Sequence, residues 1–202
     1  LLATLMAIGI KPGDEVICPS FTFFATAGSI ARLGANPVFV DIDPETYLIT
    51  SENILKAITP KTKAIMPVHI LGNMCDMDRF ISIVSRYPLP IVEDATEALG
   101  TTYKGKSAGT FSPLAAFSFN GNKIISTGGG GVIVTDDEAL AKHAKHLTTT
   151  AKASADEYYH DEVGYNYRLV NVLAAIGVAQ MELLPSFIKR KKEIVAFYKK
   201  EL

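Results

Sequence analysis

The sequence predicts an α/β domain in three layers, α/β/α, with helices on both faces of a mostly parallel mixed sheet. Short apolar, β-rich runs alternate with stretches of helical spacing along the chain, the order of elements that is typical of α/β layered folds. Most of the strand-like runs are continuously apolar, which indicates strands buried on both faces. The 202 residues are 48% hydrophobic and can fill one sizeable core.

The first half of the chain alternates between the two kinds of element. Residues 1–8 predict the last turns of a helix, because Gly9 follows them and glycine favours the conformation in which helices end. Phe80, Ile83 and Val84 have helical spacing and predict the last helix of this half. The predicted strands are 15–19, 37–41 and 64–70, and the predicted helices are 26–33, 51–58 and 76–86.

The second half continues the alternation and ends in a helical tail. Apolar runs predict the strands, and helical spacing returns after a polar segment. The predicted strands are 91–93, 115–119 and 132–135, and the predicted helices of the tail are 172–184 and 187–202. The tail runs off the chain uncapped, and residues 1–8 lack an N-cap. We therefore expect both ends to be cut from something longer.

Charge and composition exclude several classes of function. The formal net charge is −1 and no Lys/Arg cluster is flanked by aromatic residues, so we expect no nucleic-acid partner. The two cysteines, Cys18 and Cys75, are far apart and form no CxxC pair, which fits a reducing cytoplasm. No apolar run approaches the roughly 18 residues of a membrane span, and no signal peptide opens the chain. We expect no membrane association.

The glycine-rich run at residues 128–131 does not match a nucleotide-binding fingerprint. These glycines precede an apolar strand, whereas GxGxxG follows a strand and opens a helix. No GxxxxGK[ST] loop is present either. A tight turn or a close approach of the backbone to a ligand explains the run better.

The most informative residues are an acid that closes one predicted strand and a lysine just past the next. Asp94 ends the run 90–94, and ligands of α/β proteins gather at such strand ends. Lys123 follows Ser118 and two asparagines. A pyridoxal-phosphate enzyme needs this pair, because a lysine holds the cofactor as a Schiff base and an acid pairs with its pyridine nitrogen. Ser118 can donate its hydroxyl to the cofactor phosphate. Alone, Asp94 could equally be structural and Lys123 a surface lysine.

Other candidates have two interpretations each. Phe23 could stack on an aromatic ligand, although the spacing favours ordinary core packing. His69 is either a satisfied buried histidine or a contact near the ligand. His143 and His146 stand three apart on a helix, a spacing that could suit a metal. Without a second cluster of ligands, a solvated helix face is favoured, and we expect no metal site.

The polar segment 164–168 precedes the helical tail. Its last residue, Arg168, could clamp a phosphate or a carboxylate. From the residues alone, we infer an exposed loop that is capable of binding an anion.

Six segments, taken together and in order, resemble the DegT/DnrJ/StrS family of sugar aminotransferases, which are fold-type I pyridoxal-phosphate enzymes. The resemblance covers nearly all 202 residues, and the ordered set is specific although each piece alone is not. The segments are 13–17, 20–23, 38–43, 93–95, 117–119 with Lys123, and 164–168.

The resemblance implies a role for each matched residue. It implies that Asp94 binds the pyridine nitrogen, that Lys123 forms the covalent link to the cofactor, and that Ser118 contacts the phosphate. Phe23 matches the aromatic residue that stacks on the ring. Glu97 matches a position near the phenolic oxygen that is usually Gln or His. A carboxylate there is unfavourable unless it is protonated or turned away.

The loop that matches Asn166 to Arg168 is typically lent to the neighbouring subunit, so the resemblance implies a homodimer with shared active sites. Asn166 is the candidate cofactor contact of this loop, and Arg168 and His69 are candidate substrate contacts. The family's phosphate-binding Ser-Gly-Thr turn would lie before Leu1, and its small C-terminal domain would follow Leu202. Residues 1–202 are therefore expected to be the cofactor-binding large domain, truncated at both ends.

The resemblance implies a pyridoxal-phosphate-dependent transaminase that moves an amino group from glutamate onto a nucleotide-linked keto-sugar, for the biosynthesis of amino sugars or cell-surface glycans. Related sugar dehydratases form the first alternative, and Lys123 argues against them because they carry histidine at its position. A catalytically silent fragment or regulatory binding module is the second alternative. The sub-assignment to UDP-linked 4-keto sugars of the bacillosamine or legionaminic type rests on the string 93–100.

Overall fold

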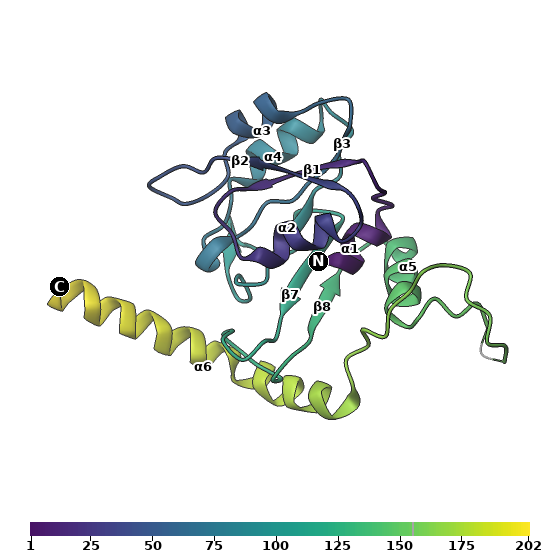
Figure 1. The fold of residues 1–202 in the computed structure, drawn as a ribbon. Helices are drawn as coiled ribbons and strands as arrows, with labels where there is room; N and C mark the ends of the chain where they lie inside the picture. The colour runs from purple at the N-terminus through teal and green to yellow at the C-terminus, as the bar shows by residue number, and fades with distance from the viewer. Residues whose placement is uncertain (155) are drawn as a thin grey trace. The chain divides into compact units, whose positions relative to one another are not determined.

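The computed structural model describes residues 1–154 and 156–202, which cluster into two compact units (Figure 1). Unit 1 consists of Leu1–Phe117 and Val132–Arg168, and unit 2 consists of Ser118–Gly131 and Leu169–Leu202. The strand ends that carry the candidate acid thus belong to unit 1, and the candidate lysine belongs to unit 2.

Parallel strands form the central layer of unit 1, as the sequence predicts. β1 pairs in parallel with β2 and β3, and β4 pairs in parallel with β7. Parallel bridges Ile65–Ile91 and Val68–Asp94 join the two groups, so the strand order is β2-β1-β3-β4-β7-β8. The bounds are β1 Glu15–Pro19, β2 Asn36–Val40, β3 Thr62–Ile65, β4 Val92–Asp94, β7 Leu114–Ser118 and β8 Gly131–Val134.

Helices and one hairpin complete unit 1. A short 3-10 turn, η1 (Ile70–Gly72), follows the β3 region, and the antiparallel hairpin β5–β6 precedes β7. The hairpin strands are β5 Thr102–Tyr103 and β6 Lys106–Ser107. The helices are α1 Leu2–Ala7, α2 Phe24–Ala31, α3 Ser51–Ala57, α4 Met77–Val84 and α5 Glu138–Thr148.

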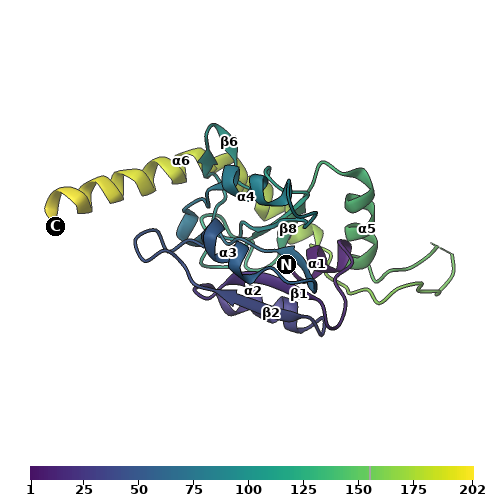
Figure 2. The ribbon, with the colours of Figure 1, turned by 90° about the horizontal axis from the view of Figure 1, so that it is seen from above.

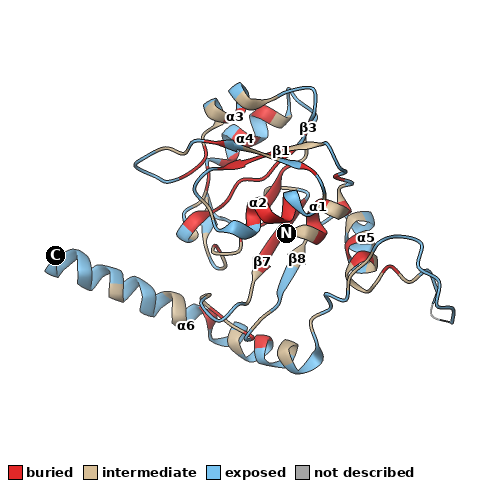
Figure 3. Cartoon of the chain, in the orientation of Figure 1, coloured by how far each residue is buried: buried red, intermediate tan, exposed pale blue. Residues whose placement is uncertain are grey.

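Side chains of β1 enter two different cores, which establishes the three layers. Successive residues of a strand point to opposite faces of the sheet. Ile17 belongs to a buried cluster with Ile54 of α3, whereas Val16 and Cys18 belong to a cluster with Ile30 of α2. The sheet is therefore buried between two helical layers, and the predicted fold class is confirmed (Figure 3).

α1 and α5 pack against each other at one side of unit 1, as both views show (Figures 1 and 2). Ala7 of α1, Leu114 of β7 and Ala144 and Leu147 of α5 form one buried cluster. This contact fixes the position of α5, which carries His143 and His146.

The end of β3 differs from the prediction. The apolar run 64–70 predicts a strand throughout, but regular pairing ends at Ile65. Pro67 has no N–H to donate, so the ladder is interrupted and returns only as the isolated bridge at Val68.

Unit 2 contains the long helix α6 (Asn171–Glu201) and the loop 118–131. The sequence predicts two helices here, separated around Pro185. This prediction is wrong, because α6 continues through Pro185 as one helix of 31 residues. Proline removes one hydrogen bond within a helix, and long helices accept that loss at a single position.

α6 also passes a test for membrane-spanning helices by length and composition. An 18-residue window has a mean hydropathy of 1.4, and 11% of it is buried. The expectation that no segment approaches a span is therefore wrong for this helix, although Gln180 and Glu182 interrupt its apolar run. One such helix is weak evidence for a membrane, because ordinary helices pass the same test.

Candidate active site

Asp94 is a buried carboxylate at the C-terminal end of β4. Its side chain accepts a hydrogen bond from the Thr26 hydroxyl to Oδ2 at 2.8 Å and one from the Thr96 N–H to Oδ1 at 3.3 Å. The Thr26 hydroxyl is itself 2.8 Å from the Thr22 hydroxyl. A carboxylate has about four acceptor positions. Two donors hold this one in place, and acceptor capacity is left for a cationic partner.

The α2 helix places Thr26 against Asp94 and leaves Phe23 in solvent. Phe23 is the N-cap of α2, and its side chain is 75% exposed. The core-packing interpretation of Phe23 is therefore wrong. The aromatic ring of Phe23, one helical turn before Thr26, is accessible for stacking on another ring.

His69 is a satisfied buried histidine, the first of its two interpretations. The ring has no exposed surface, and its Nδ1 accepts a hydrogen bond from the Cys75 N–H at 3.3 Å. Because Nδ1 is an acceptor, Nε2 carries the proton and donates to Glu93 at 3.0 Å. These bonds occupy both ring nitrogens, so in this arrangement His69 supports the strand end rather than facing a ligand.

Glu93, next to Asp94 in β4, is the hydrogen-bond partner of His69. The sequence analysis did not single it out. Its carboxylate has no exposed surface and accepts from His69, from the N–H groups of Gly109 and Phe111, and from the Ser112 hydroxyl at 2.8–3.0 Å. Burial raises the pKa of Glu93, but the hydrogen bonds, with His69 first, outweigh it and hold the pKa below its usual value. An acid inside an otherwise apolar strand was the available signal.

Glu97 is half-buried, and its Oε2 accepts the N–H of Leu71 at 2.7 Å. Leu71 has a left-handed backbone, with φ of 53°. At least one oxygen of the Glu97 side chain is thus bound to the η1 turn. This hydrogen bond is one way in which the structure accommodates a carboxylate at this position.

Ser118 and Lys123 lie in the loop of unit 2. Ser118 ends β7, two residues after Ala116, the partner of Asp94 in the sheet register. Its hydroxyl accepts the N–H of Asn120 at 3.3 Å, a bond that leaves the hydroxyl hydrogen itself unused. Lys123 is half-buried in the turn after Asn120, whose carbonyl accepts the Lys123 N–H at 3.0 Å.

Asn166 and Arg168 are exposed, as the polar segment predicts. Backbone hydrogen bonds attach this segment to the end of α5: the Tyr165 N–H donates to Leu147 and the Tyr167 N–H donates to Thr148. The segment therefore presents two polar side chains from a backbone that is held in place.

The arrangement of unit 1 defines a class of protein. A three-layer α/β/α domain with a buried acid at the carboxyl end of a parallel strand is the large-domain fold of fold-type I aminotransferases. The model of the DegT/DnrJ/EryC1/StrS aminotransferase family matches residues 1–202. The chain belongs to this family, and the resemblance drawn from the sequence is confirmed.

Named relatives agree with the family. GDP-perosamine synthase from Escherichia coli O157:H7 is 46% identical over 98% of this chain and 54% of its own length. UDP-2-acetamido-2-deoxy-3-oxo-D-glucuronate aminotransferase from Pseudomonas aeruginosa is 42% identical over 96% of this chain and 54% of its own length. The solved structure of NtdA from Bacillus subtilis with bound cofactor PMP is 37% identical, with a TM-score of 0.84 over 91% of this chain and 42% of that one. The chain spans about half the length of the curated relatives it matches.

Proposed function

We propose that the protein is a pyridoxal-phosphate-dependent aminotransferase that transfers an amino group from glutamate to a nucleotide-linked keto-sugar. The observation that carries this proposal is Asp94, a buried carboxylate held by Thr26 at a parallel strand end. The names of the two curated relatives reported above specify a GDP-linked and a UDP-linked sugar. The free cysteines, Cys18 and Cys75, support a reducing, cytoplasmic location.

The residues present fit this cofactor. When bound, pyridoxal phosphate supplies an electron sink for the carbon that gains or loses the amino group. Asp94 would hold the proton at the pyridine nitrogen, with a gross attraction of about 4 kcal/mol at an effective dielectric constant near 20. Thr26 keeps the Asp94 carboxylate oriented through its 2.8 Å hydrogen bond. Phe23 would offer a ring face to the pyridine.

Ser118 and Lys123, two residues of unit 2, have proposed roles of their own. The Ser118 hydroxyl would donate to a phosphate oxygen, since its recorded bond with Asn120 uses only an acceptor position. The Nζ atom of Lys123 would hold the cofactor through its carbonyl carbon, with loss of water, and once the amino donor had displaced it there it would move a proton as general acid/base at the substrate carbon.

The lysine assignment is tested by trapping with borohydride. In the protein loaded with pyridoxal phosphate, Lys123→Ala should abolish both the trapped cofactor adduct and the conversion of glutamate to 2-oxoglutarate with a keto-sugar. Lys106→Ala, which changes an exposed lysine of β6, is the matched control and should retain both. A covalent adduct at another lysine in Lys123→Ala would refute the assignment.

We further propose that active sites are shared in a homodimer, with Asn166 and Arg168 contributed to the neighbouring subunit. The exposure of both residues supports this proposal. Arg168→Ala and Lys123→Ala should each be inactive. After subunit exchange between them, a shared-site dimer contains one site with both changes and one intact site, so part of the activity returns. If no activity returns after confirmed exchange, Arg168 serves the site of its own chain.

A further inference from the structure

Outside the candidate active site, three metal-ligating side chains of unit 1 converge beside the end of α5. The ligand atoms of His146, Asp161 and Glu162 all lie within 4.8 Å of one another. Nε2 of His146 is 2.6 Å from Asp161 Oδ1 and 3.9 Å from Glu162 Oε1. We propose that these three side chains bind a divalent transition-metal ion of the Zn²⁺ class.

The loop that follows α5 carries Asp161 and Glu162, a second group of ligands that the sequence alone does not reveal. The spacing of His143 and His146 on a helix favoured a solvated helix face only because the sequence showed no further ligands near them. The chain turns back after α5, and the adjacent acids at 161 and 162 arrive at the same face of the helix. Two segments 15 residues apart therefore meet at one point.

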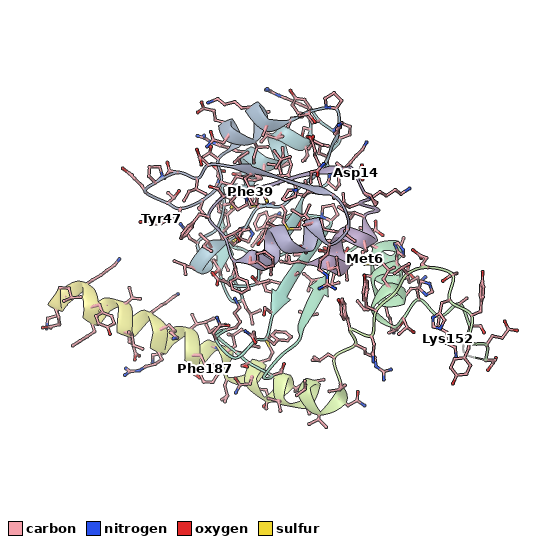
Figure 4. The ribbon with its side chains drawn as sticks, viewed as in Figure 1. Met6, Asp14, Phe39, Tyr47, Lys152 and Phe187 are labelled. Carbon is pink, nitrogen blue, oxygen red and sulfur yellow. The ribbon has the colours of Figure 1, made fainter. Side chains whose placement is uncertain are left out.

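Backbone hydrogen bonds hold this loop against α5 independently of the ligand side chains. The Ala151 N–H donates to the His146 carbonyl at 2.8 Å, and the Asp161 N–H donates to the Ala151 carbonyl at 3.3 Å. Lys152 and His160 form an antiparallel bridge across the loop, which extends from the body of unit 1 where Lys152 is labelled (Figure 4). The main chain thus holds the two segments that carry the ligands beside each other.

The same stretch contains backbone conformations that are costly for the residues that adopt them. Thr150 and Ala151 have φ of 73° and 51°, a region that non-glycine residues rarely occupy. Gly164 passes so close that an added Cβ would lie 2.4 Å from the Ala151 nitrogen. Strain of this kind persists where the surrounding structure enforces it, and it clusters at ligand sites.

His143 acts as a positioning residue for Glu162. Its Nδ1 lies 3.2 Å from the Ala7 carbonyl oxygen, and its Nε2 lies 3.0 Å from Glu162 Oε2. Both partners are hydrogen-bond acceptors, so these bonds fix the orientation of the ring and of the Glu162 carboxylate. A metal-ligand carboxylate is commonly oriented by such a hydrogen bond.

The ligand types and spacings suit zinc. Imidazole and carboxylate ligands bind Zn²⁺ tetrahedrally at about 2.0–2.2 Å, which places ligand atoms about 3.4 Å apart. His146 Nε2 and Asp161 Oδ1 now share a hydrogen bond of 2.6 Å, so these two atoms would move apart as the ion replaces the bonded proton, and the 3.9 Å separation between His146 Nε2 and Glu162 Oε1 would shorten. The three side chains are half-buried or exposed, so water can complete the shell. The cysteines do not compete for zinc, because Cys18 and Cys75 are both buried.

Binding of Zn²⁺ to the full chain tests the proposal. Titration calorimetry should show one saturable site, and Co²⁺ in its place should give the visible absorption of a four-coordinate ion. His146→Asn should weaken Zn²⁺ binding at least about tenfold. Glu157→Gln changes an exposed acid of the same loop and should leave affinity within about twofold.

A folding check and a second ligand variant distinguish loss of the metal site from loss of the fold. Circular dichroism checks that each variant is folded. If His146→Asn does not fold, Glu162→Gln takes its place, with the same expected loss. Absence of saturable Zn²⁺ binding in the unchanged chain overturns the proposal. So does binding that both ligand variants retain, because the ion would then occupy another place.

Discussion

Replacement of Glu93 by glutamine should destabilise unit 1 more than most single substitutions. The carboxylate accepts four hydrogen bonds from donors on two segments: one from His69, and three from the stretch 109–112, where the donors are the backbone of Gly109 and Phe111 and the Ser112 hydroxyl. It therefore joins β4 to the β3 region and to the turn before β7. Glutamine keeps the shape of the side chain but replaces one acceptor oxygen with an NH₂ group that faces other donors.

The magnitude follows from the donors that lose their acceptor. Each buried polar group left unsatisfied costs about 1–3 kcal/mol, and one retained oxygen can still serve about two of the four donors. We therefore expect Glu93→Gln to lower the free energy of unfolding by about 3 kcal/mol. Ser112→Ala, which removes a single donor, should cost only about 1 kcal/mol.

Urea denaturation followed by circular dichroism measures both values at pH 7. The pKa of Glu93 is held below its usual value, so its contribution is present above the pKa of the unfolded state and is lost as pH falls through the folded pKa. The difference between the unchanged chain and Glu93→Gln should therefore narrow when the titration is repeated near pH 4. A loss below about 1 kcal/mol at pH 7, or one that stays the same at both pH values, would refute the reasoning.

Three further predictions concern other parts of unit 1. Thr26→Val, which removes the hydroxyl bonded to Asp94, should weaken cofactor binding measured by absorbance titration; unchanged affinity would make that hydrogen bond irrelevant to the cofactor. Gly164→Ala should lower the midpoint of urea unfolding, because a Cβ there would lie 2.4 Å from a backbone nitrogen; an equal midpoint would show that the loop relaxes freely. Burial raises the pKa of Cys18 and of Cys75 to about 12, so a thiol reagent should react with both only after unfolding, and rapid reaction of the folded chain would contradict their burial.

Where burial decides the structure, the sequence was sufficient to predict it. β1 was predicted at residues 15–19 and is found there, because its apolar run reflects a strand buried on both faces. The candidate acid was found for a similar reason, since a polar residue that ends an apolar strand is conspicuous. What surrounds that acid was not predictable. Thr26 and Asp94 are 68 residues apart, and no local pattern indicates which hydroxyl will reach which carboxylate.

Local signals were also missed. The β5–β6 hairpin turns at Lys104 and Gly105, both with positive φ of 48° and 81°. Such a pair is typical of two-residue hairpin turns. The strands are only two residues long, too short to show alternation. Pro185 suggested a break between two helices, because proline cannot donate a backbone hydrogen bond. The helix continues through it all the same, because the rest of α6 tolerates one missing hydrogen bond.

The adjacent acids of β4 show how one strand serves both stability and chemistry. Successive side chains of a strand point to opposite faces, so Glu93 and Asp94 face different surroundings although they are neighbours. Glu93 has four donors that use its charge internally, whereas Asp94 has two and retains acceptor capacity. A shift of register by one residue would exchange the two faces. The pairing of Asp94 with Ala116 of β7 fixes that register. That pairing therefore determines that the less satisfied carboxylate, Asp94, is the one presented toward α2.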